Sequence, residues 1–318
     1  MFYNPSETKK KYKHIYGPVL SRRLGRSLGL DLVPYKTCSY DCLYCQLGLT
    51  TDKTVERKKY VSVQDILSEL KDILAKGIKA DYITLSGSGE PTLHSDLAEI
   101  IMAIKKLTKI PVAVLTNGSL LWQKQVRQAL LKADLVVPSL DAGSVDSFEQ
   151  VNRPHQAVSF EQMKDGLIAF RQEYFGKIWL EIFLLVGIND NDKEIAQLVD
   201  IVKLIEPDKV QLNTVSRPPA EVICQAVSKE KMEQIARRFT PPAEVIASFP
   251  KHRQIESAGS LQDILGMCQR RPGTIEQIAR TFNLHPNEVI KYLQKLQEQG
   301  LIEQKKIDDQ IYWIGKTI

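Results

Sequence analysis

Short apolar runs rich in β-branched residues alternate with amphipathic helical stretches along most of this chain. Each run ends in a polar or glycine-containing turn, and the pattern repeats from about residue 28 onward. Such an alternation predicts an α/β fold in which helices cover a parallel sheet. We expect six strands, at residues 28–33, 82–86, 112–116, 135–139, 179–186 and 209–213. Because a closed TIM barrel needs eight, the sequence predicts a partial (β/α)6 barrel of the TIM type, with a doubly wound sheet as the alternative.

Polar groups that can do chemistry follow the predicted strands at one end. A cysteine-rich loop follows the first strand, GSGEPT the second, Asn117 the third, Asp141 the fourth and GIND the fifth. Both candidate architectures place their active sites in the loops at the carboxyl ends of the strands. The sequence therefore predicts one site built from these loops.

The C-terminal part of the chain has a different pattern. Three short helical patterns and then a two-stranded hairpin pattern are expected within residues 259–318. A capping-box pattern at 274–277 and Pro286 mark the starts of the second and third helices. This order is typical of a winged helix-turn-helix domain. The sequence thus predicts a barrel at 1–217 with a basic N-terminal extension, a connector at 218–258 and a winged-helix domain at 259–318.

Three of the five cysteines, Cys38, Cys42 and Cys45, lie close together in one loop. Their C-x3-C-x2-C spacing brings three thiolates to one side of the loop, which suits three corners of a cubane iron–sulfur cluster. Zinc is the main alternative, but structural zinc sites have four protein ligands, and no fourth candidate lies next to the loop. Three ordinary buried cysteines are the remaining interpretation. Cys224 and Cys268 stand alone and are expected to be buried free thiols, so one cluster is predicted.

The overall sequence also limits where the protein works. No apolar run reaches the roughly 18 residues that a membrane span needs, and the N-terminus lacks the apolar core of a signal peptide. An odd number of cysteines, three of them clustered, indicates metal or redox chemistry in a reducing compartment. The sequence therefore predicts a cytoplasmic protein with no membrane partner.

The cysteine loop resembles the signature of the radical SAM enzymes, in which an aromatic residue, here Tyr44, precedes the third cysteine. The resemblance implies one [4Fe–4S] cluster held by Cys38, Cys42 and Cys45, with S-adenosylmethionine (SAM) chelating the open iron. It also implies reductive cleavage of SAM to methionine and a 5′-deoxyadenosyl radical, which abstracts hydrogen from a substrate. An electron donor such as flavodoxin or ferredoxin is then expected as a partner.

A second stretch is similar to the GGEP motif of the same family, whose backbone and glutamate meet the methionine amino group. It consists of Ser88, Gly89, Glu90 and Pro91. Ser88 replaces the first glycine of the motif, and Gly87 before it is expected to allow the turn. A plain glycine-rich turn is the alternative. The resemblance further implies contacts with the rest of SAM or with substrate by Asn117, Ser139, Asp141, Gly187 and Ile188. Helix capping is the alternative role for Asn117, Ser139 and Asp141.

Within this superfamily, the sequence looks most like the branch of the wyosine-synthesising enzymes, which modify a guanosine in tRNA. GPVLSRRLGRSLGLDL at 17–32, the cysteine loop and VNRP at 151–154 carry this resemblance, over about residues 15–217. Many members of the branch are known only as predicted iron–sulfur oxidoreductases, so membership does not fix the substrate. The chain also has no cysteine before Cys38, where the archaeal and eukaryotic wyosine enzymes hold a second cluster.

Basic residues gather near the N-terminus, where the first 60 residues contain 12 Lys and Arg against 5 Asp and Glu. Arg22, Arg23 and Arg26 lie there, and Arg153 follows the fourth strand. Guanidinium groups pair with phosphate oxygens, so these four are candidate substrate contacts, with structural ion pairs as the alternative. Residues 259–318 hold 8 Lys and Arg against 7 Asp and Glu, which is a weak balance for a DNA-binding module.

Three functions are consistent with these features. The first is a radical SAM enzyme acting on tRNA or another macromolecule, which the winged helix helps to present. The second is a radical SAM activase or modifier of a protein or a small metabolite. The third is a non-enzymatic iron–sulfur sensor that binds DNA, although GSGEPT has no purpose in it. No catalytic side chain beyond the cluster and SAM is predicted.

Overall fold

The computed structural model describes residues 12–215, 220–221, 223–247, 261–282, 284, 286–307 and 310–316. The basic stretch before residue 12, parts of the predicted connector and the predicted turn at 308–309 lie outside the described residues. In the described part of the chain, every helix is too short or too polar to cross a membrane.

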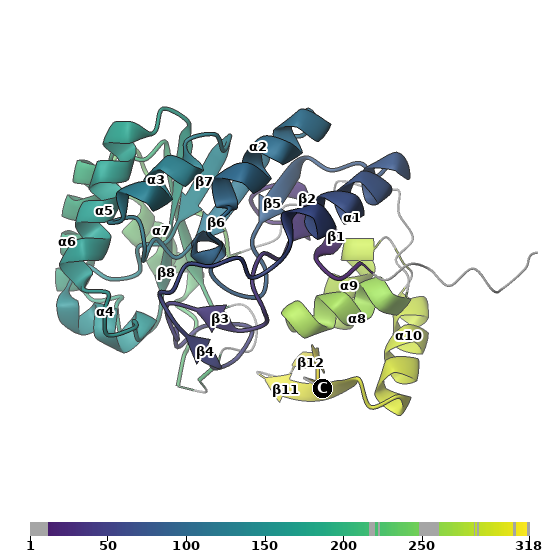
Figure 1. Ribbon diagram of the computed structural model, residues 1–318. Coiled ribbons are helices and arrows are strands. Elements are labelled where there is room, and N and C mark those ends of the chain that lie inside the picture. The colour runs from purple at the N-terminus through teal and green to yellow at the C-terminus, as the bar shows by residue number, and fades with distance from the viewer. Residues whose placement is uncertain are drawn as a thin grey trace, which may run out of the picture.

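The main sheet of the described residues has eight strands in the order β1-β2-β5-β6-β7-β8-β9-β10 (Figure 1). Their bounds are Ile15–Ser21, Gly25–Leu30, Tyr82–Leu85, Val112–Thr116, Leu135–Pro138, Lys177–Leu184, Lys209–Thr214 and Glu244–Val245. β1 is antiparallel to β2, and all the other neighbours are parallel. The strand order follows the chain order, whereas a doubly wound sheet reverses it. The fold is therefore a mixed α/β fold whose parallel sheet is consistent with a partial barrel.

The six predicted strands correspond to β2, β5, β6, β7, β8 and β9, with ends shifted by up to three residues. β1 and β10 were not predicted. Proline cannot donate to a ladder, so within a sheet it is confined to edge strands or irregular positions. In the structure β1 is an edge strand whose register shifts between Tyr16 and Val19, and this irregularity accommodates Pro18.

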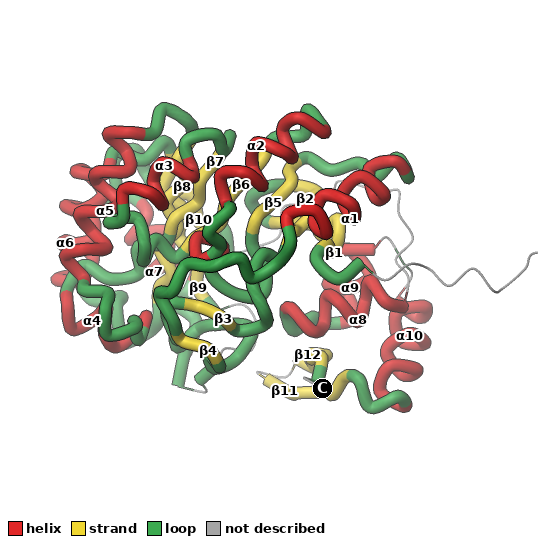
Figure 2. Tube along the Cα trace, in the orientation of Figure 1, coloured by secondary structure: helices red, strands yellow, loops and turns green. Residues whose placement is uncertain are grey.

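Helices follow the strands and cover the sheet (Figure 2). They are α1 Val63–Ala75, α2 Leu97–Leu107, α3 Lys124–Leu130, α4 Val145–Asn152, α5 Phe160–Glu173, α6 Asp192–Ile205 and α7 Lys229–Ala236. In α1, the N-cap Ser62 accepts a hydrogen bond from the Asp65 N–H, and Ile66 and Leu70 face the core at helical spacing. Gly77, with φ of 72°, follows the end of this helix. The helices and the strands share one large hydrophobic core.

The C-terminal unit contains α8 Leu261–Arg270, α9 Ile275–Phe282, α10 Pro286–Glu298, β11 Ile302–Ile307 and β12 Gln310–Gly315. β11 and β12 pair antiparallel, so the expected order of three helices and a hairpin is present. This unit has a hydrophobic cluster of its own, which includes Met267, Leu293 and Trp313. Figure 1 shows it beside β1 and α1, and α8 and α9 both contact β1.

Candidate active site

The cysteine loop leaves the carboxyl end of β2 and is bracketed by two short parallel strands, β3 (Thr37–Cys38) and β4 (Asp52–Lys53). Two backbone hydrogen bonds fold the loop between them. The Cys45 N–H donates to the Cys42 carbonyl, and the Gly48 N–H donates to the Cys45 carbonyl. The loop thus holds three free thiols at the carboxyl edge of the sheet.

Each of the three cysteine sulfurs accepts a hydrogen bond from a side-chain N–H donor. The pairs are Asn117 Nδ2 to Cys38 Sγ at 3.5 Å, Asn152 Nδ2 to Cys42 Sγ at 3.5 Å, and Lys36 Nζ to Cys45 Sγ at 3.2 Å. The donors come from three different segments: the end of β6, the end of α4 and the start of the loop. Hydrogen bonds of this kind stabilise negative charge on sulfur and tune bound clusters.

Burial disfavours the free thiolate at two of these positions. The pKa of Cys38 is raised to about 12, first by desolvation and then by the nearby Glu90 carboxylate. Desolvation, followed by the charge of Asp141, also holds the pKa of Cys42 well above its ordinary value. Metal binding replaces the thiol proton with positive charge. The donor set therefore fits a group that binds thiolates and accepts N–H bonds at its sulfurs, as an iron–sulfur cluster does.

A site for one metal ion is not evident here. Among the described residues, no three or more Cys, His, Asp or Glu side chains surround a common point for an ion. A zinc site needs its ligands to converge in this way. A cubane cluster instead binds each thiolate through a different iron. The geometry therefore gives the zinc alternative no support.

Lys36 is a site residue that the sequence pattern did not indicate. Its side chain is buried, with a residue exposure of 3%, and its backbone has a φ of 60°. This left-handed conformation costs a residue with a Cβ about 1 kcal/mol, and glycine is the usual solution. A buried lysine in that conformation indicates that its ammonium group has a purpose. The one signal in the sequence was its position two residues before Cys38.

The GSGEP turn after β5 is held by close backbone packing. Gly87 has a φ of 133°, and a Cβ there would lie 1.8 Å from Asp31 Oδ1. A Cβ on Gly89 would lie 1.9 Å from the Thr37 carbonyl oxygen. Ser88 is not among the residues with positive φ, so its replacement of glycine brings no backbone strain. The expectation that Gly87 allows the turn therefore agrees with the geometry.

Glu90 joins this turn to the end of β6. Its Oε1 accepts bonds from the Thr92 N–H, the Thr92 hydroxyl and the Thr116 hydroxyl, and its Oε2 accepts one from the Asn117 N–H at 2.7 Å. Desolvation raises the pKa of Glu90, although these hydrogen bonds oppose the shift. Pro91 begins the short 3-10 helix η1 (Pro91–Leu93), which Glu90 caps. Because Oε1 already accepts three hydrogen bonds and Oε2 accepts one, Oε2 has the larger capacity to accept another donor.

Asp141 holds the Tyr44 side chain by a hydrogen bond. Its Oδ2 accepts bonds from the Tyr44 hydroxyl at 2.5 Å and from Asn152 Nδ2 at 2.8 Å, while Oδ1 accepts from the Phe183 N–H. The Tyr44 ring stacks on Phe183 with centroids 3.9 Å apart. Burial raises the pKa of Asp141 to about 6. Both oxygens are thus engaged by the chain itself, and Asn152, which links Asp141 to Cys42, is a further residue that the sequence did not indicate.

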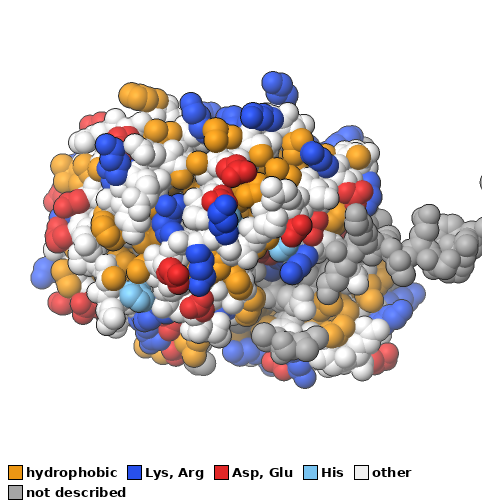
Figure 3. Space-filling view, viewed as in Figure 1, with side chains coloured by type: hydrophobic (Ala, Val, Ile, Leu, Met, Phe, Trp, Pro, Cys, Tyr) orange, Lys and Arg blue, Asp and Glu red, His pale blue; other side chains and the backbone are white. Residues whose placement is uncertain are grey.

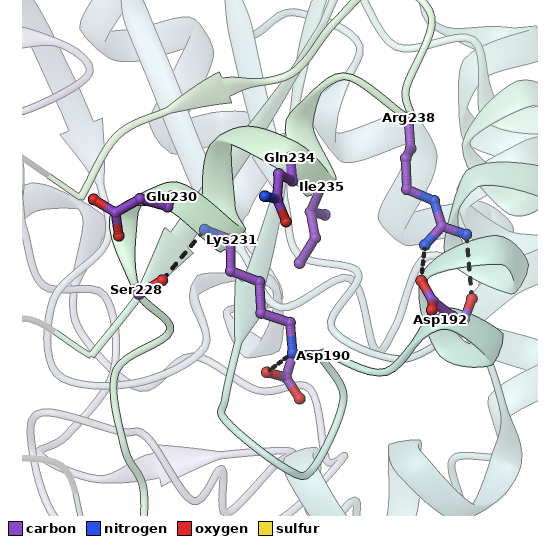
Figure 4. A pocket seen from close by; sticks show the side chains of 8 residues that line it. All are labelled: Asp190, Asp192, Ser228, Glu230, Lys231, Gln234, Ile235 and Arg238. Atoms are coloured by element: carbon purple, nitrogen blue, oxygen red, sulfur yellow. Dashed lines mark hydrogen bonds and ion pairs between the residues drawn. The ribbon is translucent and has the colours of Figure 1, made fainter.

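The GIND loop after β8 closes another side of the site. Gly187 has a φ of 72°, and its N–H donates to Asp190 Oδ1 at 2.8 Å. Ile188 packs beside Tyr44 in a small apolar cluster. Asp190 also pairs at 2.6 Å with Lys231 of α7, across an open surface pocket (Figure 4). Helix α7 therefore supports this loop.

The other strand-end residues come from β6 and β7. Ser139 directly follows β7, forms a bridge to Glu181 of β8 and is half-buried. Asn117 directly follows β6 and is shared between Cys38 and the Ser39 hydroxyl, 2.9 Å from its Nδ2. The structure thus gathers the cysteine loop, the GSGEP turn, Asn117, Ser139, Asp141 and the GIND loop at one edge of the sheet.

Three of the four candidate arginines enter the fold from the amino end of β2. Arg22 donates to the Ile246 and Ala247 carbonyls, Arg23 pairs with Glu181 at 2.5 Å, and Arg26 pairs with Asp81 at 2.9 Å. Arg22 and Arg23 belong to the β1–β2 turn, and Arg26 is the second residue of β2. The guanidinium groups of Arg22 and Arg23 extend toward the carboxyl ends of other strands, since Ile246 follows β10 and Glu181 bridges Ser139. Their observed contacts are those of the structural alternative.

Arg153 is the arginine that lies near the cysteine loop. Its carbonyl accepts a hydrogen bond from the Asp41 N–H at 3.2 Å, and its guanidinium pairs with Glu221 at 2.8 Å. Its side chain is 39% exposed. Its guanidinium can therefore reach solvent beside the site. The surface ion pair with Glu221 is weak enough for another anion to replace Glu221.

Arg23→Met is expected to destabilise the fold by about 3 kcal/mol, because it leaves Glu181 buried without its partner. Burial alone would raise the pKa of Glu181, but Arg23, helped by Asn213 and Arg22, holds this pKa below its usual value. A depressed carboxylate pKa stabilises the fold above the unfolded pKa, so the effect is present at pH 7 and is lost as the pH falls through the folded pKa. Urea unfolding at several pH values measures this.

Arg26→Met is the matched control. Its pair with Asp81 is about a third exposed on both sides, so a loss of at most about 1 kcal/mol is expected. Equal losses in the two variants, or an Arg23→Met effect that persists at acid pH, would contradict this account of Glu181.

Comparison with known proteins identifies the family. The Radical SAM superfamily matches residues 32–199 of this chain. The UPF0026 protein MJ1312 of Methanocaldococcus jannaschii is 32% identical over 306 residues, which cover 94% of this chain and 95% of that protein. A protein of Brachyspira hyodysenteriae named GTPase Obg is 41% identical over 96% of this chain, but the chain spans only 45% of its length.

A solved structure agrees with the fold. It is a radical SAM methyltransferase from Sphaerobacter thermophilus, with a TM-score of 0.52 and 15% sequence identity. The match covers 71% of this chain and 67% of the methyltransferase. At this identity the likeness concerns the fold alone.

Proposed function

The chain belongs to the radical SAM superfamily and is related to the UPF0026 proteins over nearly its whole length, and from this premise we propose that it cleaves SAM reductively at the cysteine loop. Membership supports a radical SAM enzyme and implies a [4Fe–4S] cluster and SAM as cofactors. The observation that carries the proposal is the set of three N–H donors, one on each cysteine sulfur.

When bound, the cluster and SAM would supply the radical chemistry, the reductive cleavage of SAM to methionine and a 5′-deoxyadenosyl radical. Cys38, Cys42 and Cys45 would hold the cluster. The side chains of Lys36, Asn117 and Asn152 would stabilise the charge on their sulfurs. Glu90 and Asp141, which would line the cofactor site, are each only 2% exposed, so this part of the site wall is buried.

We assign the carboxyl-edge residues to SAM. Glu90 Oε2 accepts one hydrogen bond and can take another from an amino group, and the turn of Gly87, Ser88 and Gly89 is packed against Asp31 and Thr37, which fixes its backbone next to Glu90. Tyr44, Asn117, Ser139, Gly187 and Ile188 complete the set at the neighbouring strand ends. Because both Asp141 oxygens are already engaged, we assign Asp141 to holding Tyr44 and Asn152 in place.

Anaerobic reconstitution tests this proposal. Full-length protein, reduced with dithionite and supplied with SAM, is expected to form 5′-deoxyadenosine and methionine. Deuterium transferred from a labelled substrate pool into 5′-deoxyadenosine would report the hydrogen abstraction. Reconstituted protein that carries iron and sulfide but neither binds nor cleaves SAM would contradict the proposal.

For the substrate we propose tRNA or another RNA, in line with the wyosine-like motifs. The helix-helix-helix-hairpin order of the C-terminal unit supports a winged-helix assignment, and Arg153 lies next to the site with an exposed guanidinium. A protein or metabolite substrate is the second candidate, favoured by the mixed charges on the face in Figure 3, where blue and red groups are interspersed. A flavodoxin or ferredoxin is the proposed electron donor.

Filter binding with pooled tRNA separates the two candidates. An RNA substrate is expected to bind with an affinity that falls by about tenfold or more between about 50 and 200 mM salt, as released counterions require. Arg153→Met is expected to weaken this binding, because it removes a phosphate partner. Failure to retain any RNA pool at low salt would leave the protein or metabolite substrate.

A further inference from the structure

The C-terminal unit reaches the carboxyl edge of the sheet through the last residue of α8, Arg270. Its Nε and Nη2 donate to Asp31 Oδ2 at 3.0 and 2.8 Å, and its guanidinium lies 4.2 Å from the centre of the Tyr16 ring. Asp31 directly follows β2, and Tyr16 belongs to β1. The two units are thus joined by an ion pair that has two hydrogen bonds. The side chains are 19% exposed for Arg270 and 9% exposed for Asp31.

Both partners of Arg270 also hold the turn that precedes Glu90. The other oxygen of Asp31, Oδ1, accepts a hydrogen bond from the Ser88 N–H at 2.7 Å. The Tyr16 hydroxyl lies 3.1 Å from the Ser86 hydroxyl. Gly87 lies between these serines and has no room for a Cβ, because Asp31 occupies the space. A Cβ at Gly87 would also lie 3.1 Å from the Tyr16 ring. Arg270 therefore sits behind the two side chains against which this turn is folded.

The contacts continue to the cysteine loop. The Ser88 carbonyl accepts a hydrogen bond from the Lys36 N–H at 2.7 Å, and Lys36 Nζ donates to Cys45 Sγ. The Ser88 peptide is therefore fixed on both sides, by Asp31 at its N–H and by Lys36 at its carbonyl. An unbroken series of hydrogen bonds links Arg270 to Cys45.

The charges make this arrangement sensitive to the loss of Arg270. A carboxylate buried to this degree is costly unless it is paired and hydrogen-bonded. Arg270 holds Oδ2 with two hydrogen bonds while the Ser88 N–H holds Oδ1, so the two donors together fix the orientation of the carboxylate. Without Arg270, Asp31 would gain by turning toward water, and Ser88 would lose the acceptor that sets its position.

We propose that Arg270 is a positioning residue of the SAM site, so that the C-terminal unit completes the cofactor-binding turn of the barrel. The inference rests on the proposed function, in which this turn receives the methionine part of SAM. The C-terminal unit then acts on SAM affinity from within the chain. Anything that lifts α8 away from β1 would loosen the Ser88 peptide and weaken SAM binding.

SAM affinity of the full-length, reconstituted protein tests the proposal. Arg270→Met keeps the length of the side chain and removes its charge, and the Kd for SAM is expected to rise about tenfold, as the loss of two charge-assisted hydrogen bonds to Asp31 implies. Arg270→Lys keeps the charge without the two-pronged geometry, and is expected to recover part of the affinity. The change that SAM induces in the EPR spectrum of the reduced cluster should shrink in the same order.

A double-mutant cycle with Asp31→Asn tests whether Arg270 acts on SAM binding through Asp31. Asparagine keeps an oxygen for the Ser88 N–H but loses the charge that needs Arg270, so the double variant should bind SAM no worse than Arg270→Met alone. Arg280→Met, at an exposed position in the last turn of α9, is the control and should leave the Kd unchanged.

Two outcomes would overturn the inference alone, and a third would overturn the proposed function. If Arg270→Met lowers the melting temperature but binds SAM like the wild type, Arg270 only joins the two units and the inference is wrong. Additive effects of Arg270→Met and Asp31→Asn would also overturn it. If the wild-type protein itself fails to bind SAM, the proposed function fails first, and the inference falls with it.

Discussion

Cys42→Ala is expected to abolish SAM cleavage, with 5′-deoxyadenosine formation reduced by a factor of about a thousand or more. Cys42 supplies the middle thiolate of the loop, and its sulfur is held by Asn152. With it removed, two thiolates remain for a cluster that needs three protein ligands and one open iron. Iron content after anaerobic reconstitution should fall from about four per chain to a small remainder. Iron analysis and deoxyadenosine assays on the same samples measure both effects.

Cys268→Ala is the matched control for this loss. Cys268 is 1% exposed in the hydrophobic cluster of the C-terminal unit, where it packs as a small apolar side chain. Its removal should cost about 1 kcal/mol of stability and leave iron content and cleavage near the wild-type values. A Cys42→Ala protein that keeps a full cluster and cleaves SAM would show that the thiolate trio is not the cluster site. About eight irons in the wild type would show a second cluster that the sequence did not predict.

The parallel sheet and the position of the site could be predicted from the sequence because both depend on local patterns. Each buried parallel strand is a short apolar run, and each run ends in a polar loop, so the strands and the edge that carries the polar loops follow from the pattern, whereas the strand order was left open between a partial barrel and a doubly wound sheet. The cysteine spacing and the Glu90 turn are likewise contiguous in the chain. Strand ends shifted by up to three residues, because pairing with β1, which was not predicted, determines where β2 begins.

The residues that support the site could not be predicted because their roles depend on distant partners. Asp31 gains its role from Arg270, 239 positions away in the chain, and Asn152 contacts Cys42 across 110 positions. Both residues lie in stretches that carried the family resemblance, 17–32 and 151–154, but these stretches do not show which distant residue each one contacts. Arg22, Arg23 and Arg26 show the same dependence, because their basic pattern left open either phosphate contacts or structural pairs, and the fold gives each of them a partner within the chain. Charge in a sequence therefore indicates a binding surface only after the internal carboxylates and carbonyls are known.

Lys36→Met is expected to lower the reduction potential of the cluster by roughly 100 mV and to slow SAM cleavage about tenfold or more. The buried ammonium lies 3.2 Å from Cys45 Sγ and favours the more negative, reduced cluster. At an effective dielectric constant of about 20, a charge this close contributes about 2 to 4 kcal/mol, and about 1.4 kcal/mol corresponds to 59 mV for one electron. Redox titration followed by EPR measures the potential.

Lys36→Gly separates this electrostatic role from a structural one. Glycine adopts the observed φ of 60° without strain, so the backbone should gain up to about 1 kcal/mol while the ammonium is lost. We therefore expect the potential to fall as in Lys36→Met, although the protein unfolds at a urea concentration no lower than that of Lys36→Met. Lys59→Met removes a surface ammonium that pairs with Asp96, and should change neither property. An unchanged potential in both Lys36 variants would mean that the left-handed lysine does not act on the cluster, and its backbone strain would then have no functional explanation.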